Sequence, residues 1–184
     1  MASLVAAFAF VFGLLGADGL AAQTPERFEF SEVHMGTEFR IVFYASGAQA
    51  ADAAARSTFA ALARLDSLFS DYRDDSEIAE VAARAGSGAL HVASPELTSL
   101  LTEAVRWAER SGGAFDPTLG PLTKLWRWSA RRGELPDSSR LHEAKSRVGF
   151  EGLRVEPSGG VALVRSGMSL DLGGIAKGFA GDVM

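Results

Sequence analysis

A pair of glycines separates an acidic from a basic residue in Leu170-Asp171-Leu172-Gly173-Gly174-Ile175-Ala176-Lys177. This pattern predicts a short strand over 169–172, a tight turn, and a helix that begins near Ile175. The first N–H groups of a helix are free for an anion, and the helix dipole favours phosphate there. Lys177 adds a positive charge, and Asp171 can accept a hydroxyl or a ring N–H. A tight turn alone explains the glycines, but not the flanking Asp and Lys.

Two earlier segments carry single residues that suit ligand binding. Met35 precedes Gly36 in a turn between two expected strands, although a Met at a strand end more often belongs to the core. Tyr72 lies in a polar turn between two expected helices, where a planar ring can stack on a ligand ring. The alternative for Tyr72 is a side chain that covers helix ends.

The segment Gly113-Ala114-Phe115-Asp116-Pro117-Thr118 combines conformational freedom with a fixed carboxylate. Gly112 and Gly113 let the backbone approach a ligand closely. Pro117 holds Asp116 extended, which makes it a suitable acceptor for an amide or a sugar hydroxyl. The alternative is that Asp116 caps the helix that contains Trp126, and both readings are compatible.

The elements that must position these residues follow the order strands, a block of helices, then strands. Hydrophobic periodicity, caps and turn residues predict strands over 27–31, 37–45, 89–92, 153–156 and 161–164, and helices over 49–69, 76–85, 95–111 and 137–148. Ser76 and Ser94 are the expected N-caps of two of these helices. This order predicts an α+β fold rather than a doubly wound α/β sheet.

Composition excludes several classes of function. The chain has 184 residues, enough for one domain with a core, and a formal net charge of -5 without basic runs. A nucleic-acid interface is therefore not expected. The absence of Cys excludes disulfides, thiolate metal sites, a cysteine nucleophile and a lipid-attachment site.

The first 22 residues are typical of a secretory signal peptide. An apolar run over 5–15 is followed by small residues, although no Lys or Arg precedes it. We therefore expect 23–184 to be exported, to the periplasm or the outer face of the inner membrane, and not to be a lipoprotein.

The four motifs, in this order, resemble the ApbE family of flavin transferases (FAD:protein FMN transferases). The match is closest over 171–180 and over 113–118, and Met35-Gly36-Thr37 and Ser70-Asp71-Tyr72-Arg73 with Ser76-Glu77 add to it. The resemblance implies an α+β, T-fold-related architecture. It also implies magnesium-dependent transfer of FMN from FAD to a Thr hydroxyl of a target protein, with release of AMP. The implied targets are subunits of membrane-bound electron-transfer complexes.

The resemblance also assigns roles to individual positions. It implies that FAD is bound by Met35, Tyr72, Ala114, Phe115, Asp116, Asp171 and Lys177, with Tyr72 stacking on the flavin. It implies that the Gly174 carbonyl is a ligand of Mg2+, a cation that prefers oxygen. The family's further metal ligands and catalytic base have no match here, so we expect them beyond Met184, in a missing C-terminal part. We expect this piece alone to have little or no activity.

The residues leave three other functions open. Two of them use the same fold: hydrolysis of FAD to FMN and AMP, and flavin binding without chemistry. The third is an exported structural or interaction domain whose Gly-rich turns are only turns. The residues alone indicate an exported α+β protein with a phosphate-binding turn, and the flavin specificity comes from the resemblance.

Overall fold

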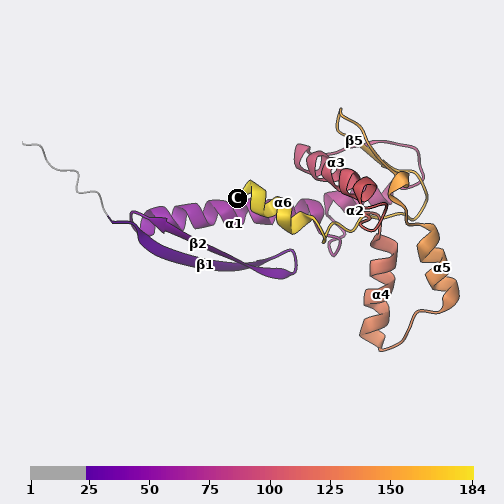
Figure 1. Ribbon diagram of the computed structural model, residues 1–184, viewed down its shortest axis with the longest axis horizontal. Helices are drawn as coiled ribbons and strands as arrows, with labels where there is room; N and C mark the ends of the chain where they lie inside the picture. The colour runs from indigo at the N-terminus through magenta and orange to yellow at the C-terminus, as the bar shows by residue number, and fades with distance from the viewer. Residues whose placement is uncertain (1–23) are drawn as a thin grey trace, which may run out of the picture.

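The computed structural model describes residues 24–184, so the expected signal peptide over 1–22 lies outside the described part. The molecule is elongated. A long helix and a β-hairpin form one end, and the remaining helices and a small sheet form the other (Figure 1). The α+β class with antiparallel strands is confirmed. Among the described residues, no helix combines the length and apolar character needed to cross a bilayer.

The hairpin consists of β1 (Glu26–His34) and β2 (Thr37–Ala45), paired antiparallel from Glu26↔Ala45 to His34↔Thr37. Every second residue of β2 is half-buried and its neighbours are exposed, because successive side chains of a strand face opposite sides. The half-buried face packs against α1 (Ala48–Phe69). The expected strand over 27–31 was too short, because the ladder continues to His34.

Helix α1 buries one face, as its periodicity predicts. The buried positions recur every three or four residues: Ala51, Ala55, Phe59, Leu62, Leu65 and Phe69. Helix α6 (Ala176–Val183) lies beside α1 (Figure 1), and the rings of Phe69 and Phe179 meet edge to face with centroids 5.8 Å apart. The C-terminal helix thereby returns to the end of α1.

A second unit combines α2 (Glu77–Ala83), α3 (Pro95–Arg110) and a small sheet. The sheet has the order β3-β5-β4, with β3 at His91–Val92, β4 at Leu153–Val155 and β5 at Gly160–Leu163, all antiparallel, and the short helix η1 (Phe150–Gly152) precedes β4. The predicted N-caps are confirmed: Ser76 accepts from the Ala79 N–H and Ser94 from the Leu97 N–H. The core of this unit includes Leu97, Leu100, Leu101, Val161 and Leu163.

Helices α4 (Gly120–Arg132) and α5 (Ser138–Ser146) form a hairpin that extends away from α3 and β5 (Figure 1). Asp137, where the expected helix over 137–148 begins, caps α5 through a 2.8 Å bond from the Arg140 N–H. The alternative reading of Asp116, as the N-cap of α4, was wrong, because Leu119 occupies that position. A Cβ at Gly120 would lie 2.4 Å from the Ser169 Oγ, so the start of α4 packs closely against the segment around Ser169.

The expected strand over 169–172 is not a strand. Ser169 forms one isolated parallel bridge with Leu119, and the Asp171 N–H donates to the Pro117 carbonyl at 2.9 Å. Leu170 and Leu172 are nevertheless buried in the core, which explains the strand-like pattern. The segment is extended and held by side-chain burial rather than by a ladder.

Candidate functional site

A cavity of about 180 Å³ lies where the turn of the β1–β2 hairpin, the end of α1, helix α4 and the start of α6 meet. Its lining residues come from segments far apart in the sequence: Met35, Gly36, Asp66, Phe69, Ser70, Asp71, Tyr72, Arg127, Asp171, Gly173, Ala176 and Lys177. Four of the seven predicted FAD-binding residues, Met35, Tyr72, Asp171 and Lys177, are therefore brought to one place. Three of the four sequence motifs contribute to this cavity.

Met35 reaches the cavity through a strained turn. His34 pairs with Thr37, so Met35 and Gly36 form a two-residue loop, and both have positive φ, at 50° and 70°. This is the pattern of a type I′ hairpin, which favours Asn, Asp or Gly at both positions. Met35 is the one non-glycine residue with positive φ among residues 24–184. Such strain at a cavity wall indicates a functional constraint on the Met side chain.

Tyr72 lies on the loop between α1 and α2 with its side chain largely in solvent, at 72% exposure. The guanidinium of Arg127 lies over the ring, with Cζ 4.2 Å from the ring centroid. The alternative reading, in which Tyr72 only covers helix ends, does not fit this exposure. A ring held on one side and open to solvent can stack on a planar ligand.

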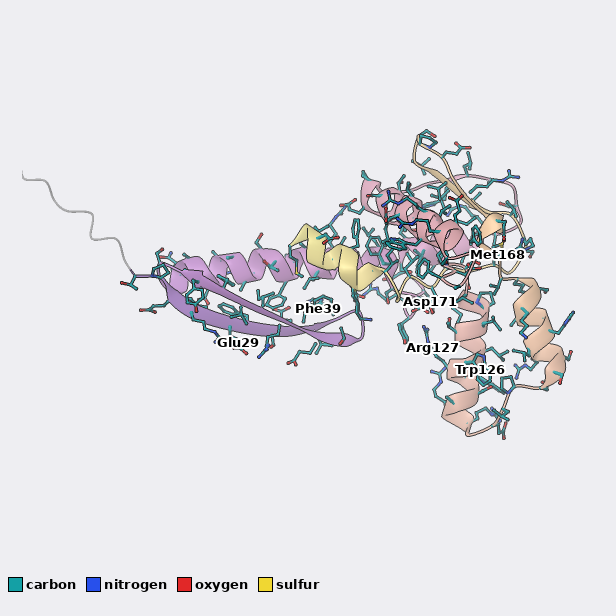
Figure 2. The ribbon with its side chains drawn as sticks, viewed as in Figure 1. Glu29, Phe39, Trp126, Arg127, Met168 and Asp171 are labelled. Atoms are coloured by element: carbon teal, nitrogen blue, oxygen red, sulfur yellow. The ribbon has the colours of Figure 1, made fainter. Side chains whose placement is uncertain are left out.

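Asp171 is held by two partners. Its Oδ1 accepts from the Gly173 N–H at 2.9 Å, and its Oδ2 lies 3.4 Å from Nη2 of Arg127. Arg127 also donates from Nη1 to Oδ2 of Asp71 at 2.6 Å (Figure 2 shows Arg127 and Asp171). Burial opposes the charge of Arg127, but the hydrogen bond and charge of Asp71, with Tyr72 and Asp171, raise its pKa above the usual value.

Arg127 was missed by the sequence analysis, and so was the place of Asp66 in the cavity wall. Arg127 lies between Trp126 and Trp128 in a helix that has several other basic residues. No local pattern separates it from a solvated charge, because its partners are 56 and 44 residues away. Only the docking of α4 against two loops shows its place.

The predicted glycine turn precedes α6, but its first N–H groups are used differently from the prediction. The N–H groups of Ile175 and Ala176 both donate to the Leu172 carbonyl, so these two are not free for an anion as expected. Lys177 is exposed, lines the cavity and forms no ion pair with any residue of 24–184. It is the positive group of this turn that is available for a phosphate.

The motif over 113–118 lies beside the cavity rather than in its wall. Phe115 packs on Gly174, where a Cβ would lie 3.3 Å from the Phe115 Cε2, and both residues line a second hollow of about 220 Å³ with Trp107 and Ile175. Ala114 is exposed and lines neither space. Gly173 lines the first space and the next residue, Gly174, lines the second.

Asp116 is buried, and both carboxylate oxygens are engaged within the chain. Oδ1 accepts from the N–H and the hydroxyl of Thr118 at 2.7 and 2.6 Å, and Oδ2 accepts from the Phe150 N–H at 3.1 Å. The Thr118 hydroxyl in turn accepts from the Gly149 N–H at 2.9 Å. Asp116 thus ties the turn before α4 to the segment before β4.

The described residues do not by themselves form a magnesium site. The Gly174 carbonyl accepts no backbone hydrogen bond in the described part, so its oxygen is available. However, residues 24–184 contain no group of three His, Cys, Asp or Glu that could hold a metal ion. One carbonyl is too few ligands for Mg2+, which demands octahedral coordination.

Comparison with known proteins identifies the relatives of the chain. The FAD:protein FMN transferase of Treponema pallidum is 39% identical over 159 residues, which cover 83% of this chain and 44% of that protein. The enzyme of the same name from Chlamydia muridarum is 34% identical over 121 residues, which cover 65% and 38%. The chain therefore spans about half or less of the length of these relatives.

Solved structures agree with this result. The ApbE protein of Thermotoga maritima has a TM-score of 0.76 at 27% identity, over 86% of this chain and 51% of that one. The flavin transferase ApbE of Vibrio cholerae has a TM-score of 0.77 at 26% identity, over 87% and 52%. The profile of the ApbE family matches residues 35–184. The chain belongs to the ApbE family.

Proposed function

We propose that this chain forms the FAD-binding part of an enzyme that transfers FMN from FAD to a Thr hydroxyl of a target protein and releases AMP. One observation carries the proposal: Met35, Tyr72, Asp171 and Lys177, which the sequence keeps far apart, line one cavity. The relatives named FAD:protein FMN transferase support the transfer of FMN from FAD to a protein.

The cavity suits the two chemical halves of a flavin nucleotide. The exposed ring of Tyr72 offers a flat surface for the isoalloxazine, and Met35 and Phe69 provide apolar contacts. Lys177 offers an unpaired positive charge to a phosphate. Asp171, fixed by the Gly173 N–H and by Arg127, keeps lone pairs for a hydroxyl or N–H donor of the ligand.

In the proposed reaction, a bond forms between the Thr oxygen and the phosphorus of the FMN half. The bond from this phosphorus to the oxygen of the AMP half breaks, and AMP leaves. The Thr proton passes to a base, which the resemblance does not match to any of these residues. The chain's own part in the reaction is to bind and orient FAD, which is a large share of the catalysis of phosphoryl transfer.

Magnesium dependence is part of the proposal. Magnesium, when bound, would neutralise charge on the pyrophosphate, and the Gly174 carbonyl would be one of its oxygen ligands. We also propose, from the sequence of 1–22, that the protein is exported and, from the family resemblance, that its targets belong to membrane-bound electron-transfer complexes. Fractionation of cells that express the tagged protein tests export, and recovery in the cytoplasm would contradict it.

An assay with three readouts tests the reaction. The enzyme of which this chain is the FAD-binding part is incubated with FAD, Mg2+ and a target protein, and the products are examined for FMN on a target Thr, free FMN and AMP. The proposal predicts target-bound FMN with an equal amount of AMP, and removal of Mg2+ should abolish both. Free FMN without modified target would indicate FAD hydrolysis, and bound FAD with neither product would indicate a flavin-binding protein.

A further inference from the structure

Arg127 connects three parts of the molecule that are remote in sequence. It projects from α4, in the hairpin that extends away from α3 and β5, and its side chain crosses to the loop after α1 and to the segment before α6 (Figure 2). The side chain is 30% exposed, whereas its two carboxylate partners, Asp71 and Asp171, are 9% and 15% exposed. Arg127 therefore lies at the cavity wall, with partners more deeply buried than itself.

The three contacts use different parts of one planar group. Nη1 donates to Asp71 at 2.6 Å, Nη2 lies 3.4 Å from Asp171, and the flat face covers the Tyr72 ring at 4.2 Å from the centroid. Only a guanidinium can offer two edge donors and a stacking face together, because an ammonium is a point charge. The contacts hold the ring of Tyr72 and the carboxylate of Asp171 in fixed relation.

The charges that line the cavity favour a cation at this position. Its wall contains three carboxylates, Asp66, Asp71 and Asp171, and two cations, Arg127 and Lys177. The buried Oδ1 of Asp66 has no hydrogen-bond partner in the described part. Without Arg127, Asp71 and Asp171 would lose the ion-pair partner that each has among the described residues, which is costly for nearly buried carboxylates and should shift both from their present positions.

We infer that Arg127 is a positioning residue, which fixes Tyr72 and Asp171 in the arrangement that receives the flavin. This inference rests on the proposed function. A direct contact between Arg127 and a ligand phosphate is the competing role. Positioning is favoured because the two terminal nitrogens already face carboxylates and the flat face already covers Tyr72.

The two roles predict different changes in affinity for riboflavin and for FAD, because riboflavin has the flavin ring but no phosphate. Arg127→Met and Arg127→Lys are compared with the wild-type chain by titration of riboflavin and of FAD, with flavin fluorescence as the signal. Arg131→Met is the matched control, because Arg131 is exposed on the same helix and lines neither hollow. Circular dichroism shows whether each variant is folded.

We expect Arg127→Met to lower the affinity for riboflavin and for FAD by the same factor, roughly tenfold, because a charged contact is lost. The fluorescence quenching at saturation should also fall, because the Tyr72 ring is no longer held parallel to the flavin. Arg127→Lys should restore part of the affinity but not the full quenching. Arg131→Met should match the wild type.

Loss of affinity for FAD alone would overturn the positioning role in favour of a phosphate contact. Unchanged affinity and quenching in Arg127→Met would overturn it as well, while leaving the proposed function intact. If the wild-type chain binds neither flavin, the proposed function fails and this inference fails with it. Should Arg127→Met not fold, Asp71→Asn replaces it, because this change weakens the 2.6 Å contact and is expected to reduce quenching with both flavins.

Discussion

At the scale of single residues, the cavity is built from side chains that are costly for the fold. Met35 adopts φ 50°, which a Gly or Asn would adopt more readily, and Asp66 has a buried oxygen without a partner in the described part. Two acidic residues depend on one Arg. Costs of this kind concentrate at functional sites, where ligand binding rather than stability determines the residue.

The variant Met35→Asn should separate the contribution of this position to stability from its contribution to ligand binding. Asn tolerates positive φ, so we expect the free energy of unfolding to increase by about 1 kcal/mol. Loss of the apolar Met side chain from the cavity should at the same time weaken FAD binding. Denaturant unfolding and a fluorescence titration measure the two effects, and a fall in stability together with unchanged FAD affinity would contradict this account of the turn.

At the scale of elements, local patterns predicted most helices and strands, because their signals lie within the segments themselves. The buried stripe of α1 and the Ser caps of α2 and α3 are examples. The segment over 169–172 has a strand-like alternation of polar and apolar residues, but its buried leucines are held by tertiary packing and not by a ladder. The contacts of Arg127 escaped prediction because they depend on how α4 docks, which no local pattern encodes.

Asp116 connects two elements, because its carboxylate joins the turn before α4 to the segment before β4. We expect Asp116→Ala to lower the free energy of unfolding by about 2 kcal/mol or more, since it leaves buried N–H groups without an acceptor. Chemical denaturation measures this change. A fully stable variant that has lost only FAD affinity would show instead that Asp116 is chiefly a ligand of FAD.

At the scale of the whole molecule, the chain brings a hairpin turn, a helix end, a projecting helix and a glycine turn to one cavity. The resemblance assigned FAD binding to seven residues, and four of them, Met35, Tyr72, Asp171 and Lys177, line one cavity. Ala114 and Asp116 lie outside the cavity wall, and Phe115 lines the second hollow, where it packs on Gly174. The central claim is therefore that this cavity binds FAD through the face of Tyr72.

The most direct test is an equilibrium titration of FAD with the wild-type chain, Tyr72→Ala and Tyr44→Ala. Tyr44 is the matched control, because it is similarly exposed, at 67% against 72% for Tyr72, but lies on β2 outside the cavity. We predict saturable binding of one FAD, weakened about fivefold or more in Tyr72→Ala by the loss of stacking and unchanged in Tyr44→Ala. Absence of saturable binding, or equal affinity in the wild type and Tyr72→Ala, would contradict the claim.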